Sequence, residues 1–242
     1  MSNSLRKITT ISRLKAFLML RNMNLMITPI FAIAFVLIFK AVIPQDAMGN
    51  SIHPYLLSFG LLFSIVLGGV MMACYPLAEE KEKNTLRVLM TSSVSAKEFL
   101  IGSLIPPFSF TMVINFILIP LSGSSFNGAQ ILWFVLITAI TTLTSLVIGL
   151  IIGIFSRTQM QAGLNSMPIA LILVFAPLLG QMTSHLDKVT DYLYSGVLMK
   201  FIYAAASKSY QINWTDSFVL LIWLAAGSGI FLLAFRRRGF AD

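Results

Sequence analysis

The chain has 242 residues, of which 57% are hydrophobic and 11% are charged, and its mean hydropathy is +0.86. An average soluble domain is roughly 45–50% apolar and 25% charged, so the composition excludes a soluble globular protein. The apolar residues occur in blocks of about 20, the length that crosses a bilayer. The net charge of +8 does not indicate nucleic-acid binding, because the basic residues lie mostly beside these blocks. The only cysteine, Cys74, allows neither a disulfide within the chain nor a thiolate metal cluster.

A hydropathy window of about 19 residues predicts an all-α integral membrane protein with six transmembrane helices, forming one domain over residues 1–242. The expected spans are residues 23–43, 55–77, 100–121, 131–155, 165–182 and 217–235. Small residues recur at fourfold spacing in the second and fourth spans, at Gly60, Ser64 and Gly68 and at Ser145, Gly149 and Gly153. Such spacing indicates close packing of helix backbones.

Residues 1–22 precede the first span and are expected to remain on the protein rather than to be cleaved as a signal peptide. As a helix, this segment places Ile11, Leu14, Phe17 and Leu18 on one apolar face. The pattern predicts an interfacial helix lying in the headgroup layer. The alternative is a solvated basic leader.

The basic residues divide unevenly between the two sides that six spans define. Thirteen of the 17 Lys and Arg residues precede the first span, follow the sixth, or lie between spans two and three or spans four and five. The other four are Lys40, Lys188, Lys200 and Lys208. Because basic residues near span ends stay on the cytoplasmic side, we expect both termini to be cytoplasmic.

The expected external segment, residues 183–216, has apolar residues at helical spacing. They include Tyr194, Val197, Leu198 and Phe201. This spacing predicts a short amphipathic helix that rests on the outer surface, with an ordinary loop as the alternative.

The expected cytoplasmic segment, residues 79–98, combines many charges with a short apolar ridge. Leu86, Leu89 and Met90 share one helical face. A helix of about two turns is marginal alone in water, so it needs a partner surface. Ser95 and Glu98 have the spacing of a capping box, and Val94 and Phe99 that of a hydrophobic staple. We therefore expect the third transmembrane helix to start sharply after Ser95 and to act with this segment as a rigid elbow.

The same segment resembles the type-2 exporter permeases of the ATP-binding cassette (ABC) transporters. The residues that carry the resemblance are Glu80-Lys81-Glu82, Thr85-Leu86, Leu89, Thr91-Ser92 and Val94-Ser95, followed by Gly102 and Pro106. Ser93 departs from the pattern, which usually has Pro there. The basic N-terminal helix, the six spans and the external amphipathic structure also match this family.

This resemblance implies a coupling helix over residues 84–90 that docks on a separate ATPase subunit. The implied docking residues are Glu80, Glu82, Asn84, Thr85, Leu86, Arg87, Leu89 and Met90. Two ATPase copies, which bind ATP and magnesium, would serve two permeases, identical or similar, in the bacterial cytoplasmic membrane. Substrate would leave past an external gate at Tyr194, Val197, Leu198 and Phe201. The alternative reading of residues 79–98 is a solvated charged loop.

The sequence supplies no catalytic machinery of its own. It has no G-x-x-x-x-G-K-S/T loop for a nucleotide, no H-E-x-x-H, and no paired acidic or histidine residues within the spans. We therefore expect no catalytic residue, resident cofactor or metal in this chain. Candidate pathway residues are Thr111, Asn115, Thr138 and Thr142, with hydrogen bonds between helices as the alternative.

The few charges in the spans favour export of an amphipathic or hydrophobic substrate, such as a peptide, a bacteriocin-like toxin or a drug. Export of sodium or of a lipid-linked glycan fits the same architecture. A membrane sensor or immunity module for antimicrobial peptides is the alternative from another class, and a lipid-modifying enzyme lacks the residues it would need.

Overall fold

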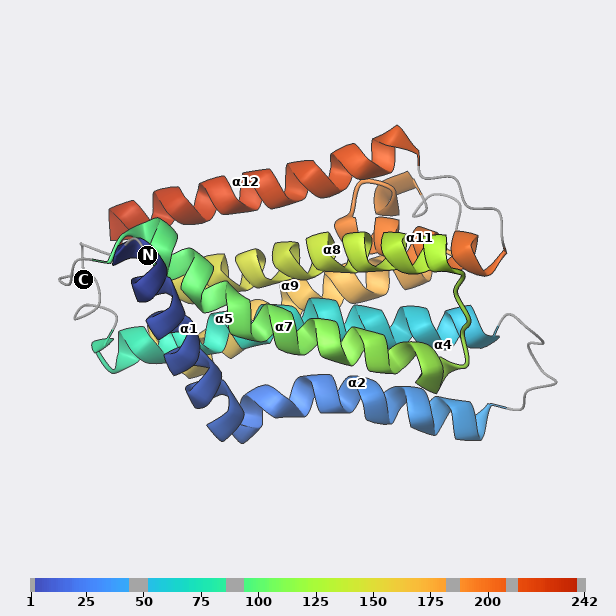
Figure 1. Ribbon diagram of the computed structural model, residues 1–242, viewed down its shortest axis with the longest axis horizontal. Coiled ribbons are helices and arrows are strands. Elements are labelled where there is room, and N and C mark those ends of the chain that lie inside the picture. Colours follow the sequence, from blue (N-terminus) through green and yellow to red (C-terminus); the bar gives the residue numbers. More distant parts are fainter. Residues whose placement is uncertain (1–2, 44–51, 86–93, 182–187, 208–212, 239–242) are drawn as a thin grey trace.

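The computed structural model describes residues 3–43, 52–85, 94–181, 188–207 and 213–238, and these residues form an all-α bundle without β-strands (Figure 1). The helices in chain order are α1 (Asn3–Arg21), α2 (Met23–Val42), α4 (Ile52–Leu61), the π-helix η2 (Leu62–Gly68), α5 (Gly69–Glu82), α7 (Ala96–Ser122), α8 (Gly128–Phe155), α9 (Gln159–Gly180), α11 (Tyr194–Ala206) and α12 (Trp214–Arg238).

Within the described residues, six helical stretches are long and apolar enough to cross a membrane, which confirms the predicted number of spans. They are Leu25–Val42, Ile52–Glu82, Lys97–Ser122, Gly128–Phe155, Gln159–Gly180 and Trp214–Phe235. The second stretch combines α4, η2 and α5. It runs beyond the predicted boundary at residue 77 because α5 continues through the charged residues Glu79 to Glu82. The chain is therefore a multi-pass membrane protein.

Side-chain caps fix where the long helices start. Ser95 and Glu98 form the predicted capping box: the Glu98 amide donates to Ser95 Oγ (3.3 Å), and the Ser95 amide donates to Glu98 Oε2 (2.8 Å). Asn127 begins α8 with a second capping box, and Thr158 caps α9 through its side chain. These local bonds satisfy amide groups that a helix start otherwise leaves unpaired.

The second span forms the centre of the bundle, since 83% of it is buried against 22% of the first span. The fourth span packs directly on it. A Cβ built on Gly149 would lie 2.3 Å from the Val70 carbonyl oxygen, and one on Gly153 would lie 2.9 Å from that of Cys74. The small residues of α8 therefore allow close backbone approach, as their spacing predicts.

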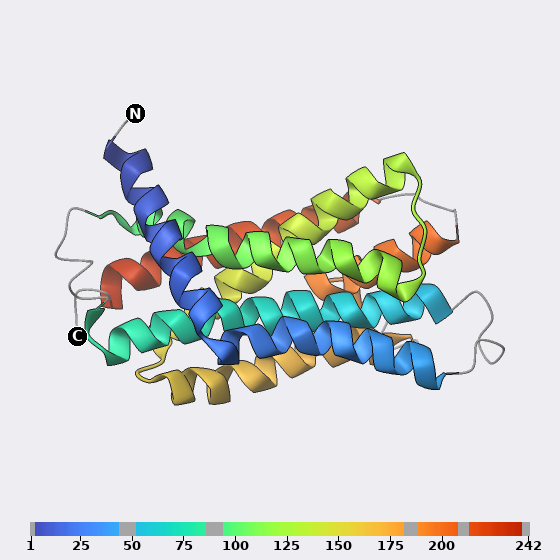
Figure 2. The same ribbon diagram turned by 60° about the horizontal axis from the view of Figure 1, so that its bottom comes forward.

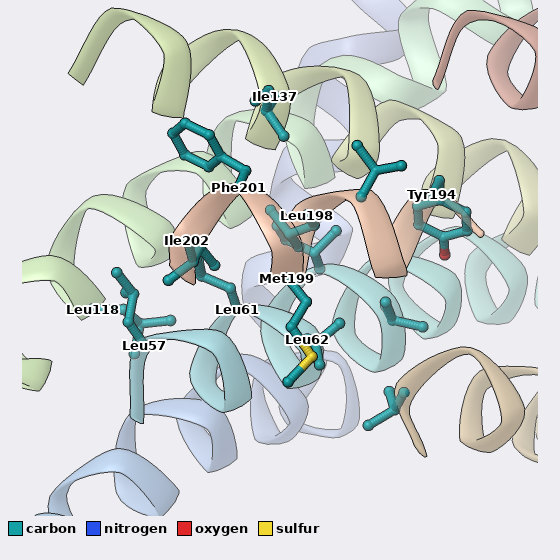
Figure 3. Packing of buried hydrophobic residues seen from close by; sticks show 14 of the residues in the cluster. Leu57, Leu61, Leu62, Leu118, Ile137, Tyr194, Leu198, Met199, Phe201 and Ile202 are labelled. Atoms are coloured by element: carbon teal, nitrogen blue, oxygen red, sulfur yellow. The ribbon is translucent and has the colours of Figure 1, made fainter. Parts of the chain in front are cut away.

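Helix α11 is present at the predicted position, but it does not rest on the outer surface. It packs into the end of the bundle, where Leu198, Met199 and Ile202 lie among Leu57, Leu61 and Leu62 (Figure 3). All of the residues from Tyr194 to Met199 are buried. The expectation of a surface helix is wrong. Most of the side chains of α11 itself are apolar or small, on more than one face of the helix, and a helix of this kind is buried.

Candidate functional site

The candidate site lies where α5 ends and α7 begins, because these two helices flank the predicted coupling segment. Helix α1 lies across both of them at a steep angle to the bundle (Figures 1 and 2). We call this region the α5–α7 end of the bundle. The end of α12 also lies there (Figure 1).

A buried ion pair joins α1 to the last turn of α5. Lys15 Nζ lies 2.6 Å from Glu80 Oε1, and the two side chains are only 8% and 11% exposed. The Lys15 ammonium also lies 5.2 Å from the centre of the Phe99 ring in α7. Losing either charge would leave the other buried and uncompensated, which costs far more than losing both.

Helix α1 also contacts the first turns of α7. A Cβ on Gly102 would lie 2.9 Å from Ile11 Cγ2 and 3.2 Å from the Ile8 carbonyl oxygen, so only a residue without a side chain fits there. Lys7 Nζ lies 4.0 Å from Glu98 Oε2. Helix α1 therefore holds both ends of the predicted coupling segment.

The predicted apolar face of α1 divides between two environments. Ile11 is buried against α7, whereas Leu14, Phe17 and Leu18 are exposed by 46–61%. Three exposed apolar side chains beside the spans are available to lipid, as expected of an interfacial helix. The position of α1 in the headgroup layer stays a prediction.

Two further bonds connect the end of α5 to the link between α8 and α9. Lys81 Nζ donates to the Ile154 carbonyl oxygen near the end of α8 (2.7 Å). Glu82 Oε2 accepts from the amide of Gln159, the first residue of α9 (3.0 Å). The cation lies at a helix C-terminus and the anion at a helix N-terminus, which is the favourable arrangement for both helix dipoles.

Helix α5 ends at Glu82, and Asn84 follows in the left-handed conformation with φ of 57°. The Thr85 hydroxyl donates to the Glu80 carbonyl oxygen (3.1 Å). Lys83 donates to Glu79 (2.5 Å), and this hydrogen bond raises the pKa of the exposed Lys83 ammonium. Asn84 thus terminates α5 instead of continuing a helix from it. Four predicted docking residues, Leu86, Arg87, Leu89 and Met90, lie outside the described residues.

The elbow residues on the other side of the segment are all described. Val94 and Phe99 pack in one apolar cluster, and Phe99 also stacks on Phe235 of α12, with ring centres 5.2 Å apart. The start of α7 is therefore fixed by the capping box and by side-chain packing.

The four candidate pathway residues are fully or almost fully buried within this single chain. The hydroxyls of Thr111 and Thr138 donate to carbonyl oxygens of their own helices. Asn115 bonds across helices, accepting from Ser64 of η2 (3.0 Å). The Thr142 hydroxyl has no hydrogen-bond partner in the part of the chain that the structure describes. The structure thus brings Asn115 to η2 and Thr111 to α5, where the Thr111 hydroxyl also donates to Met72 Sδ (3.8 Å), whereas the Thr138 hydroxyl bonds within α8.

The four candidate gate residues are buried in α11. The Tyr194 hydroxyl and Ser145 Oγ of α8 lie 2.8 Å apart in a hydrogen bond. Burial raises the pKa of the Tyr194 phenol, an effect that the bond to Ser145 partly opposes, so the phenol stays protonated. A gating role for these residues stays a prediction.

A comparison with protein families identifies the chain. Residues 6–180 match the model described as ABC-2 type transporter, which covers α1 to α9. The chain belongs to the ABC-2 type transporter family. It is a transmembrane permease subunit of an ABC transporter, a class that lacks an ATPase site of its own and generally pairs with a separate ABC ATPase. A search of curated proteins gave no match.

The permease also contains features that the sequence analysis missed. Lys15 appears in the sequence only as one more basic residue of the N-terminal segment, and nothing local predicts its buried partner. The π-helix of the second span was not expected either, although the adjacent pair Gly68-Gly69 is a signal of irregular helix at that point. Among the described residues, no group of three or more His, Cys, Asp or Glu could hold a metal ion.

Proposed function

We propose that this permease forms an ATP-driven exporter that moves an amphipathic or hydrophobic substrate, such as a peptide, a bacteriocin-like toxin or a drug, out of a bacterial cell. Two permeases, identical or similar, would enclose the pathway, and two ATPase subunits would bind ATP and magnesium. Both termini and residues 79–98 would face the cytoplasm, in line with the uneven distribution of basic residues.

The observation that carries this proposal is the set of bonds around residues 79–98. Glu80 is paired with Lys15 of α1, and Lys81 and Glu82 are bonded to the link between α8 and α9. On the other side, the capping box fixes the start of α7. A push on the segment would therefore reach five helices at once, which supports its role as the lever of a separate ATPase.

The substrate class follows from the polarity of the spans. Acidic and basic residues are scarce there, and an ion-driven carrier would need ionisable groups inside the membrane. This supports an apolar or amphipathic substrate and an external energy source. Export as the direction of transport rests on the family resemblance of residues 80–106.

Docking can be tested with the variant Leu86→Asp/Leu89→Asp. We expect it to lose co-purification with the companion ATPase and stimulation of ATP hydrolysis, because two charges replace the proposed apolar ridge. Lys97→Asp, an exposed change at the start of α7, is the control and keeps both. Unchanged binding and stimulation in the double variant would contradict docking there.

Transport itself needs a separate measurement. In inside-out vesicles, we expect ATP-dependent uptake of a fluorescent amphipathic substrate that stops in the double variant. ATPase docking without any uptake would favour the sensor or immunity module instead.

A further inference from the structure

A pocket of about 420 Å³ lies between α8, α11 and α12. Helix α11 lies at the end of the bundle opposite to the α5–α7 end (Figure 1). The volume of the pocket falls within the range of about 300–1,000 Å³ that is typical of small-molecule sites. Apolar side chains form most of the wall, among them Leu136, Ile137, Phe201 and Leu221. Trp133 adds a second aromatic ring. The pocket is thus suited to a compact apolar body.

Hydrogen bonds on two sides hold the walls of this pocket in place. Gln130 Nε2 of α8 donates to the Ala205 carbonyl oxygen of α11 (3.0 Å). Trp223 Nε1 of α12 donates to the carbonyl oxygen of Tyr192, which lies just before α11 (2.8 Å). The three helices are therefore fastened around the pocket before any ligand binds, which lowers the entropic cost of binding.

The two charged residues of the lining, Lys200 and Asp216, differ in whether an ion-pair partner is present among the described residues. Lys200 is neutralised by an ion pair with Asp191 just outside the pocket. The Asp216 carboxylate, by contrast, forms no ion pair or hydrogen bond within the described part of the chain. It lies in the first turn of α12, where a negative charge also favours the helix. Among the described residues around the pocket, the charge without an ion-pair partner is therefore the negative one of Asp216.

We infer that this pocket binds a lipophilic organic cation, with its apolar body between α8 and α12 and its positive charge at Asp216. The aromatic rings of the wall add to the attraction, because their faces favour cations. Neutralisation of Lys200 by Asp191 removes the charge that would repel such a ligand. Binding needs neither ATP nor an ATPase, so this inference stands apart from the proposed function.

The test uses the full chain in lipid nanodiscs and measures tetraphenylphosphonium binding by equilibrium dialysis, with protein-free nanodiscs as background. We expect one saturable site per chain. Asp216→Asn should weaken binding about tenfold, the loss of one charge-assisted contact. Lys200→Met should tighten it about threefold by leaving Asp191 unpaired near the pocket. Glu79→Gln removes a carboxylate at the other end of the bundle and should change nothing.

Two ligands with the same dodecyl chain and opposite charges show whether binding depends on the positive charge or only on the apolar chain. Dodecyltrimethylammonium should displace the probe, and dodecyl sulfate should not. Leu136→Trp fills the apolar part of the pocket without changing its charge and should abolish binding. If Asp216→Asn does not fold, this variant tests whether the ligand binds in the pocket. Unchanged affinity in Asp216→Asn and Leu136→Trp, or displacement by dodecyl sulfate alone, would overturn the inference.

Discussion

The ion pair between Lys15 and Glu80 allows the sharpest test of how α1 is attached to the bundle. Replacing Lys15 by Met keeps the length of the side chain and removes only its charge, which leaves the Glu80 carboxylate buried. Breaking a buried pair on one side costs about 3–5 kcal/mol, and the slight exposure of both side chains places this pair near the lower limit. We therefore expect a loss of about 3 kcal/mol of unfolding free energy for Lys15→Met and a similar loss for Glu80→Gln.

The double variant shows how much of each loss in unfolding free energy comes from the ion pair and how much from the individual side chains. With both charges removed, no buried ion remains, so we expect Lys15→Met/Glu80→Gln to lose only about 1 kcal/mol, far less than the sum of the single variants. Reversible unfolding in mixed micelles, followed by circular dichroism, gives the three free energies. Lys7→Met is the matched control on the same helix. Its pair with Glu98 is longer and more exposed, so it should cost less than about 1 kcal/mol.

Additive losses would refute this reasoning. If the loss of unfolding free energy in the double variant equalled the sum of the losses in the two single variants, the two side chains would act independently. The ion pair could then not be what joins α1 to α5.

Three other predictions concern packing and hydrogen bonds elsewhere in the bundle. Gly149→Ala should destabilise by about 2 kcal/mol, since its Cβ would overlap an α5 carbonyl, while Gly128→Ala, which has open space around it, should unfold at the wild-type denaturant concentration. Ser95→Ala should lose about 1 kcal/mol with the α7 cap, and faster amide exchange confined to the first turn of α7 is the check; uniform exchange rates would contradict it. Tyr194→Phe should lose about 1 kcal/mol in the same unfolding assay, and adding Ser145→Ala should cost less than in wild type; equal costs would mean that the two hydroxyls are not coupled.

Features set by local chemistry were predictable from the sequence. The six spans follow from the need to satisfy backbone groups in hydrocarbon, and the start of α7 follows from two side chains three residues apart, Ser95 and Glu98. The close approach of α8 to α5 was likewise visible as small residues at fourfold spacing. Each of these signals acts within one helix or one turn.

Features that depend on contacts between distant residues were not predictable. The helical spacing of Tyr194 to Ile202 shows that a helix forms, but its burial is decided by α4, α8, α9 and α12, which pack against it. The partner of Lys15 lies 65 positions along the chain at Glu80, and no pattern near either residue indicates the pairing. Asn84 was expected to begin the coupling helix, yet its left-handed backbone closes the preceding one.

Cysteine cross-linking between the permease and its companion ATPase tests the central claim most directly. With Cys74 replaced by Ser as background, Leu89→Cys should cross-link to a cysteine in the ATPase surface groove through a short bifunctional reagent. Trp214→Cys, exposed at the opposite end of the bundle, should not. Cross-linking through Trp214→Cys alone, or labelling of Leu89→Cys in intact cells by a reagent that cannot cross the membrane, would show that residues 79–98 are not the lever of an ATPase.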